Sequence, residues 1–287
     1  MIDAARTRAY RTVMAKHSPQ HQKALERSGP RPRQVAKVVT PAKVPRKLSP
    51  DEIVWVKSMI VYEDDDIMGF NKPSGLSSQG GRGLGSHNLD DLMWAFVKSS
   101  GRRPMLIHRL DRDTSGILLA ARTHPATSFL GKALAARTFV KTYLCVVSNA
   151  DRLADAGEID APLRREEIGR ESWSRVCTPD HPDAQAASTD FEVLARAGEA
   201  ALVRCRPHTG RMHQIRVHLA HLGTPIAGDA RYGGALSLEG QAVPRLMLHA
   251  LTLGFPHPAG GTKTLSAPVP ADMDALCAAI GLSDSAR

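Results

Sequence analysis

A short polar segment between two apolar runs holds the residues best suited to chemistry in this sequence. It spans residues 108–116 (HRLDRDTSG), with MLI directly before it and ILLAA directly after it. Apolar runs on both sides of a polar cluster predict a tight loop between two buried segments. Charged groups in such a loop are costly to bury unless they pair or react, and loops on a rigid scaffold often carry catalytic groups. We therefore take Asp111 as the centre of a candidate active site.

The loop alone leaves other interpretations open. Asp111 can form a purely structural ion pair with Arg109 or Arg112. Asp111 and Asp113 can form a pair of carboxylates of the glycosidase kind, although residues two apart in a tight loop need not face each other. A serine hydrolase is disfavoured because no serine lies in a GxSxG motif. Ser115 is instead expected to tie down the loop through backbone hydrogen bonds.

Two further segments place polar side chains on otherwise apolar elements. Residues 139–147 alternate as a strand, so Lys141 and Tyr143 share one face among apolar neighbours. Residues 210–223 predict a helix that ends at Gly223, with the apolar positions 212, 215, 219 and 222 facing the core. Arg216 borders this stripe. A guanidinium at the edge of a core needs a carboxylate partner.

These side chains must be positioned by short strands interspersed with helices, without a regular βαβ alternation. This order of elements predicts an α+β domain with a largely antiparallel sheet. Strands are expected over residues 59–62, 67–71, 173–178, 188–194 and 201–206, and a strand or strand pair over 245–255. Helices are expected to start at Asn88 and to cover 125–137 and 272–280. Residues 80–85 are rich in glycine but lack the GK[ST] of a phosphate-binding loop, so we interpret them as a mobile flap.

The net charge of +9 is concentrated in the first fifth of the 287-residue chain. Residues 1–50 carry 12 basic and two acidic residues, whereas the remainder carries 26 basic and 27 acidic ones. We interpret 1–50 as a basic extension, with a basic helix over 1–28 and a proline-containing linker over 28–50, and 51–287 as one catalytic domain. Such a segment favours a polyanion, most commonly nucleic acid. A solvated tail and an organelle transit peptide are the alternatives.

The composition also disfavours several classes of protein. No apolar run approaches the roughly 18 residues of a membrane span, and no secretory signal begins the chain, so we expect a cytoplasmic protein without a membrane partner. The four cysteines form no CxxC pair, which argues against a disulfide framework or structural zinc. His208, His213, His218 and His221 are spaced poorly for a metal site and are expected on a helix surface or against RNA. A monomer is the default expectation.

The ordered motifs resemble the RluA family of RNA pseudouridine synthases over about residues 58–270. HRLD at 108–111 with TSG at 114–116 resembles the family's central motif, NKPSGL at 71–76 its opening strand and loop, and KTY at 141–143 its tyrosine motif. TGRMHQIRVHL at 209–219 resembles its arginine motif, and matching patterns follow at 223–229, 245–250 and 257–258. The chain departs from the pattern at Cys145 and Ser148, where relatives commonly carry residues such as alanine and glycine. The separate amino-terminal RNA-binding domain of many relatives is not recognisable.

This resemblance implies a pseudouridine synthase fold with a central active-site cleft. It further implies isomerisation of specific uridines in ribosomal or transfer RNA to pseudouridine, a reaction that calls for no cofactor or metal. Asp111 would be the catalytic aspartate, Tyr143 would stack on the target base, and Arg216 would pair with Asp111. Arg109 would fill the gap left by the flipped uridine. Further RNA contacts are expected from His108, Arg112, Lys72, Lys141, Arg211 and His213.

Two other functions fit parts of the pattern. One is a non-catalytic RNA-binding or ribosome-assembly protein that has kept the fold, against which the intact set of Asp111, Tyr143 and Arg216 argues. The other is a carboxylate-based nucleoside hydrolase, which would release free uracil. The sequence identifies neither the RNA nor the uridine, and it does not decide whether Asp111 acts as a nucleophile or as a base.

Overall fold

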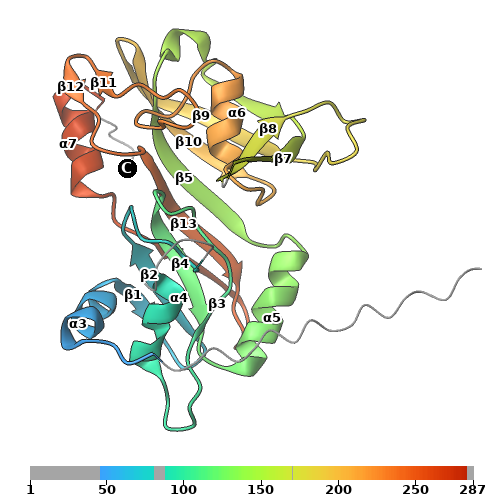
Figure 1. Cartoon of the computed structure of the whole chain (residues 1–287), viewed down its shortest axis with the longest axis vertical. Coiled ribbons are helices and arrows are strands. Elements are labelled where there is room, and N and C mark those ends of the chain that lie inside the picture. Colours follow the sequence, from blue (N-terminus) through green and yellow to red (C-terminus); the bar gives the residue numbers. More distant parts are fainter. Residues whose placement is uncertain (1–45, 81–87, 170, 283–287) are drawn as a thin grey trace, which may run out of the picture. The chain divides into compact units, whose positions relative to one another are not determined.

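The computed structural model describes residues 46–80, 88–169 and 171–282, and the chain divides into two units, Met1–Val44 and Pro45–Arg287. The second unit is an α+β domain built on one ten-stranded sheet (Figure 1). The strand order is β1-β2-β4-β13-β5-β10-β9-β6, with β3 paired to β4 and β14 paired to β13. The described pairings are antiparallel apart from the parallel pair of β4 and β13. The predicted fold class is therefore confirmed.

The strands of the large sheet vary in length from two to ten residues. They are β1 (Ile60–Glu63), β2 (Ile67–Lys72), β3 (Met105–Leu106), β4 (Ser115–Ala121), β5 (Val140–Val147), β6 (Ala156–Asp160), β9 (Ser188–Ala197), β10 (Ala200–Pro207), β13 (Leu248–Pro256) and β14 (Thr262–Ser266). Two separate hairpins are β7 (Leu163–Ile168) with β8 (Glu171–Val176), and β11 (Ser237–Leu238) with β12 (Gln241–Ala242).

Helices and short 3₁₀ turns pack around this sheet. They are α3 (Pro50–Ser58), α4 (Leu89–Leu92), η1 (Met93–Phe96), α5 (His124–Ala135), η2 (Ala150–Arg152), α6 (Gln214–His221) and α7 (Ala271–Ala279). Helix α3 begins at a capping box, in which the Ser49 hydroxyl accepts from the Glu52 amide and the Glu52 carboxylate accepts from the Ser49 amide. This cap fixes the start of α3 at Pro50.

Strand β4 is the most deeply buried element and carries the candidate catalytic loop at its start. All seven of its residues are buried, as expected for an apolar run that pairs on both sides. Gly116 has a φ of 115°, and a Cβ there would lie 2.2 Å from the carbonyl oxygen of Ala250. Only glycine allows β4 and β13 to approach so closely. Gly116 thus fixes where the loop leaves the sheet.

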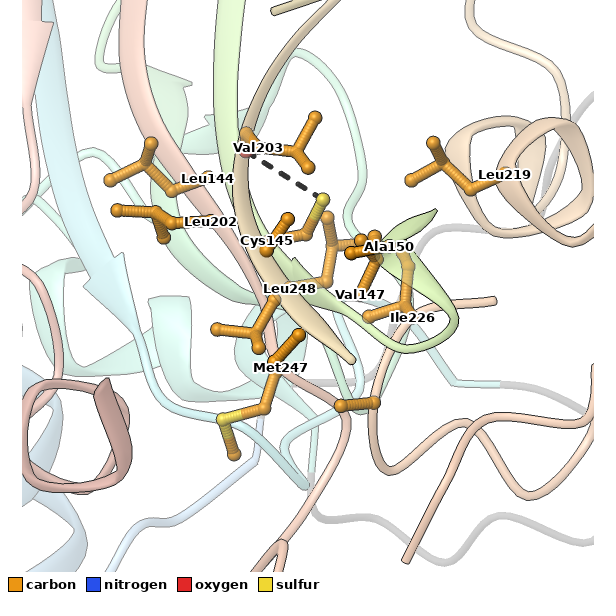
Figure 2. Packing of buried hydrophobic residues seen from close by; sticks show 14 of the residues in the cluster. Leu144, Cys145, Val147, Ala150, Leu202, Val203, Leu219, Ile226, Met247 and Leu248 are labelled. Carbon is orange, nitrogen blue, oxygen red and sulfur yellow. Dashed lines mark hydrogen bonds between the residues drawn. The ribbon is translucent and has the colours of Figure 1, made fainter. Parts of the chain in front are cut away.

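The sheet supports two hydrophobic cores. One packs β1, β2, β4, α3 and α5 around residues such as Phe70 and Leu118, and the other packs β5, β9, β10, α6 and α7. Figure 2 shows part of the second core, where Leu219 of α6 faces Val203 and Cys145 on the sheet. Tyr143 packs against both cores. A side chain at that position is well placed to lie in a site built between them.

Several predicted elements differ in extent from the observed ones. The helix expected over 210–223 begins only at Gln214, because the Gln214 side-chain oxygen accepts from the Thr209 hydroxyl and the Arg211 amide and holds 209–213 as a turn. Leu222 ends the helix and is exposed, so it does not continue the apolar stripe. Strands β6 and β7 were not predicted, since their polar sequences lack clear alternation.

Other predictions agree more closely or cannot be compared. Residues 245–255 contain one strand, β13, and the helix at Asn88 is a single short turn that continues as η1. The remaining predicted strands and helices correspond to β1, β2, β5, β8, β9, β10, α5 and α7 within a few residues. The predicted basic helix over 1–28, most of the 28–50 linker and most of the flap over 80–85 lie outside the described residues.

Candidate active site

The loop that carries Asp111 is held by its backbone. Ser78 bonds both to the carbonyl of Leu110 (2.7 Å) and to its amide (3.0 Å), and the Gly75 amide donates to the Arg112 carbonyl (2.9 Å). The Thr114 amide closes the turn onto the Asp111 carbonyl (3.2 Å). These contacts fix residues on both sides of Asp111 and leave its carboxylate free for other partners.

Lys72 lies beneath this loop and is fully buried. Its ammonium group donates to the carbonyls of Pro73 (2.9 Å), Leu76 (2.7 Å) and Arg112 (3.0 Å). Burial lowers the pKa of Lys72 to about 7, against the opposing charges of Asp111 and Asp113. Because its three donors point at backbone carbonyls and its side chain is inaccessible, Lys72 braces the loop and is not placed for the RNA contact expected from the sequence.

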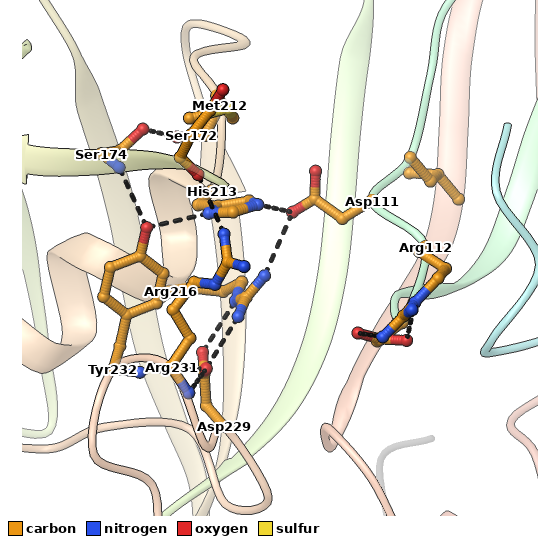
Figure 3. Close-up of polar contacts among 12 residues, drawn as sticks. Asp111, Arg112, Ser172, Ser174, Met212, His213, Arg216, Asp229, Arg231 and Tyr232 are labelled. Carbon is orange, nitrogen blue, oxygen red and sulfur yellow. Dashed lines mark hydrogen bonds and ion pairs between the residues drawn. The ribbon is translucent and has the colours of Figure 1, made fainter. Parts of the chain in front are cut away.

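The carboxylate of Asp111 faces two basic groups from the other core. Arg216 Nη1 lies 3.8 Å and His213 Nε2 lies 3.9 Å from Asp111 Oδ2, and the Asp111 side chain is 21% exposed (Figure 3). Arg112 lies on the other side of the loop, where it pairs with Asp113 (2.9 Å). The structural ion pair between Asp111 and Arg112 is therefore not formed, and Asp113 is engaged elsewhere instead of completing a carboxylate pair.

Arg216 obtains its carboxylate partner from the loop after α6. Its Nε and Nη2 atoms each donate to Asp229 at 2.7 Å, and Asp229 also accepts from the amides of Arg231 and Tyr232. The guanidinium carbon stacks 5.0 Å from the centre of the Tyr232 ring. Burial acts to lower the pKa of Arg216, but the hydrogen bonds and charge of Asp229 raise it overall. Arg216 is thus a fixed cation beside Asp111.

A chain of hydrogen bonds orients the His213 ring. The Tyr232 hydroxyl accepts from the Ser174 amide (3.0 Å) and lies 2.8 Å from His213 Nδ1 (Figure 3). Burial lowers the pKa of His213 to about 4, so the ring is neutral at neutral pH. The other ring nitrogen, Nε2, lies 3.9 Å from the Asp111 carboxylate. His213 itself has a φ of 55°, in the left-handed region.

Asp111 lies in a cleft of about 610 Å³ between the two cores. Tyr143, on the sheet, lines the cleft, and burial and the nearby charge of Asp111 raise its pKa, which keeps the phenol protonated. Asp111 is the one carboxylate among the described lining residues. The basic ones are Arg109, Arg137, Lys141, Arg165, Arg211 and Arg216. A cleft of this charge attracts anions.

The structure brings most of the predicted site residues together. Asp111, Tyr143, Arg216, Arg109, Lys141, Arg211, His213 and His108 all line the cleft. Arg109 is exposed and Arg211 is half-buried. His108 accepts from the Leu119 amide through Nε2 (3.1 Å), and burial lowers its pKa to about 3, so it supplies no positive charge for a phosphate. Lys72 and Arg112 do not line the cleft.

Sequence reasoning missed four residues that shape the site. Asp229 and Tyr232 hold Arg216 and His213, and Arg137 and Arg165 add positive charge to the walls. The need of Arg216 for a carboxylate was a signal for Asp229, which is the last residue of the motif matched at 223–229. Nothing local distinguished Tyr232, Arg137 or Arg165 from ordinary surface residues.

Neither a metal centre nor a membrane span is found in the part of the chain that the structure describes. No three His, Cys, Asp or Glu side chains there are arranged to hold an ion. His218 is buried and bonds to Thr189 (2.9 Å) and to the Ala161 carbonyl (3.0 Å), which is a structural role in the core. Within the same residues, every helix is too short or too polar to cross a bilayer.

The chain resembles known proteins in sequence and in fold. Residues 66–221 match the family model described as RNA pseudouridylate synthase. Ribosomal large subunit pseudouridine synthase D of Xanthomonas campestris is 38% identical over 245 residues, covering 79% of this chain and 70% of the relative. Ribosomal large subunit pseudouridine synthase C of Vibrio cholerae is 37% identical, covering 82% and 72%. Human RNA Pseudouridylate Synthase Domain Containing 4 shares the fold, with a TM-score of 0.67, 24% identity and coverage of 80% and 97%.

Proposed function

Because this chain belongs to the RNA pseudouridylate synthase family, we propose that it isomerises uridines of ribosomal RNA to pseudouridine with Asp111 as the catalytic group. The observation that carries the proposal is the Asp111 carboxylate, which is partly exposed in a cleft whose other charged lining residues, among those described, are basic. RNA supplies the phosphates that such a cleft attracts. The relatives are named as enzymes of the large ribosomal subunit, which favours large-subunit ribosomal RNA, and transfer RNA is the second substrate class to test.

The reaction conserves every atom of the nucleotide. The bond from C1′ to N1 breaks, the uracil turns in place, and C5 bonds to C1′ while C5 loses a proton and N1 gains one. Nothing is oxidised or reduced, so this chemistry needs no redox cofactor. Asp111 has two routes, attack on the nucleotide or removal of a ribose proton. Both use the carboxylate anion, whose charge Arg216 stabilises from 3.8 Å.

The neighbours of Asp111 receive distinct roles in this proposal. Tyr143 offers the extruded base a flat apolar face, and Arg109, which is exposed on the same loop, fills the space that the base leaves in the RNA. Extrusion costs a few kcal/mol and is cheapest for a uridine already in an RNA loop. Lys141 and Arg211 contact phosphates, which position the RNA without reading its sequence.

The basic segment 1–50 is proposed to add phosphate contacts to a cytoplasmic, monomeric enzyme. Changing its basic residues before position 45 to glutamine should weaken RNA binding and flatten its salt dependence. The measurement is the Kd for RNA at low and high salt. Unchanged values at both salt concentrations would identify a solvated tail.

The experiment that tests the function offers the purified protein unmodified transcripts of large-subunit ribosomal RNA and of transfer RNA. Carbodiimide-blocked reverse transcription then maps pseudouridine. We expect conversion at one or a few uridines of the ribosomal transcript without release of uracil. Free uracil would identify a nucleoside hydrolase, and binding without conversion would identify a non-catalytic RNA-binding protein. Conversion of transfer RNA alone would overturn the proposed substrate class.

A further inference from the structure

The cleft extends from Asp111 to the carboxyl-terminal end of α5, where one arginine has an unusual backbone. Arg137 lines the cleft, is exposed, and has a φ of 59°. Four non-glycine residues in the described chain have a φ in this left-handed region, and two of them, Arg137 and His213, line the cleft. Strained non-glycine residues cluster at functional sites because their strain is tolerated there for a reason other than folding.

The fold needs a left-handed residue at this position but has no need of an arginine side chain. The Arg137 amide donates to the Leu134 carbonyl (3.1 Å), and the Thr138 amide and hydroxyl donate to the Ala133 carbonyl (3.1 and 3.0 Å). These bonds satisfy the end of α5 through the backbone and a neighbouring residue. Glycine is the usual residue at such a helix end because it has no Cβ. The arginine is therefore unfavourable for the backbone and calls for a role outside the helix.

The surroundings of Arg137 leave its guanidinium available to a ligand. Across the described residues, no carboxylate lies within ion-pair distance of it, whereas the cleft residue Arg165 pairs with Glu167 at 2.7 Å. Leu134, three residues before Arg137, also lines the cleft and is only half-buried, as are Leu106 and Ile107.

An unpaired cation next to partly exposed apolar side chains has the chemistry of a nucleotide site. The cation binds a backbone phosphate, and the apolar surface receives a base. Helix α5 belongs to the first core and α6 to the second, so this surface lies on the other wall of the cleft from Arg216 and His213 (Figure 1). A target uridine at Asp111 leaves it free for a neighbouring nucleotide.

We propose that Arg137 and Leu134 form a second nucleotide subsite for a residue adjacent to the target uridine. Arg137 binds the backbone phosphate of that nucleotide, and Leu134 contacts its base. The inference rests on the proposed function, because it takes RNA as the ligand. It assigns to the end of α5 a part in selecting which uridines reach Asp111.

The test compares Arg137→Asn with Arg102→Asn, which removes the same charge from an exposed residue that does not line the cleft. Asparagine tolerates the left-handed backbone, so the midpoint of thermal unfolding should not fall. With the ribosomal transcript, Arg137→Asn should raise KM by about fivefold, leave kcat unchanged and reduce the slope of log Kd against log salt by about one. Arg102→Asn should leave all three at the parent values. Leu134→Ala should raise KM without changing the salt slope.

Arg137→Gly separates the side chain from the backbone. Glycine suits the left-handed conformation, so this variant should fold at least as stably as the parent and still show the raised KM. A parental KM and salt slope in Arg137→Asn, or a parental KM in Arg137→Gly, would overturn the subsite. A parent protein that forms no pseudouridine would instead contradict the proposed function. The phosphate contact would then still be tested by comparing the Kd of Arg137→Asn for the ribosomal transcript with that of the parent.

Discussion

Two carboxylates approach the same guanidinium from different parts of the molecule, and their surroundings differ. Asp229, in the loop after α6, has a fully buried side chain and makes two 2.7 Å bonds to Arg216. Asp111, in the loop before β4, is 21% exposed and lies 3.8 Å from Arg216. The hydrogen-bonding capacity of Asp229 is used by the protein, whereas that of Asp111 remains open to a ligand.

The difference shows how a fold can position a reactive carboxylate without using up its hydrogen-bonding capacity. Asp229 neutralises Arg216 in the interior, so Arg216 stays fixed whether or not Asp111 is engaged. Asp111 is positioned by its backbone, through Ser78 and Lys72, and not by its own oxygens. The comparison predicts that changes on the Asp229 side mainly cost stability, and that changes of Asp111 itself mainly cost activity.

The largest loss of stability is expected from Asp229→Asn. This change leaves a buried guanidinium without its charge partner, which costs about 3–5 kcal/mol of unfolding free energy. Urea titration measures the effect, and pseudouridine formation should fall as well, because Arg216 loses its position beside Asp111. An Asp229→Asn protein with the parental unfolding free energy would show that Asp229 does not stabilise the fold and would contradict the proposed difference between the two carboxylates.

Lys72→Met should cause the next largest loss of stability. It removes the donor shared by three backbone carbonyls beneath the Asp111 loop and should cost about 2–3 kcal/mol. Activity should fall with it, since the loop backbone is what positions Asp111. Lys98→Met, at an exposed position, is the matched control. Equal unfolding free energies in the two variants would show that Lys72 does not brace the loop.

Tyr232→Phe should have a smaller effect on stability. It removes the hydroxyl between the Ser174 amide and His213, at a cost of about 1 kcal/mol, and frees the ring of His213. Because His213 Nε2 faces Asp111, the rate of pseudouridine formation should also decrease severalfold. Tyr62→Phe removes a hydroxyl bonded to Asp64, away from the cleft, and should keep the parental rate. Equal rates in the two variants would show that the orientation of His213 does not affect activity.

The pH dependence of stability involves His249, which is fully buried. Burial lowers the pKa of His249 to about 4, below its usual value of 6.5. As the pH falls from 6.5 to 4, the unfolded chain binds a proton that the folded chain does not, so unfolding free energy falls by up to about 1.4 kcal/mol per pH unit.

His249→Asn should remove the uptake of this proton and so reduce the slope of unfolding free energy against pH by up to about 1.4 kcal/mol per pH unit. Urea titration at a series of pH values measures the slope. His124→Asn, at an exposed position, is the control. An undiminished slope between pH 6.5 and 4 in His249→Asn would show that this histidine is not held neutral in the folded protein.

Sequence patterns located the centre of the site but not its supports. The loop around Asp111 was recognisable because apolar runs enclose it, and alternation placed Tyr143 on a sheet face. Arg216 was recognised as needing a carboxylate. Which carboxylate it takes depends on how the chain folds back after α6, and periodicity carries no information on that.

Two other features depend on tertiary packing alone. A lysine at the end of a strand is normally exposed, and Lys72 is buried only because two loops close over it. The left-handed conformations of Arg137 and His213 are set by the ends of α5 and α6, and such conformations are uncommon among non-glycine residues. Local sequence therefore predicted the strands and the reactive loop better than the turns that shape the cleft.

The most direct test of the central claim compares Asp111→Asn with Asp113→Asn, two isosteric changes in the same loop. Asp113 pairs with Arg112 outside the cleft, so its loss should leave the rate of pseudouridine formation close to that of the parent. Asp111→Asn should lower that rate by about a thousandfold or more while changing the unfolding free energy by less than about 1 kcal/mol. A folded Asp111→Asn protein that forms pseudouridine at the parental rate would contradict the account.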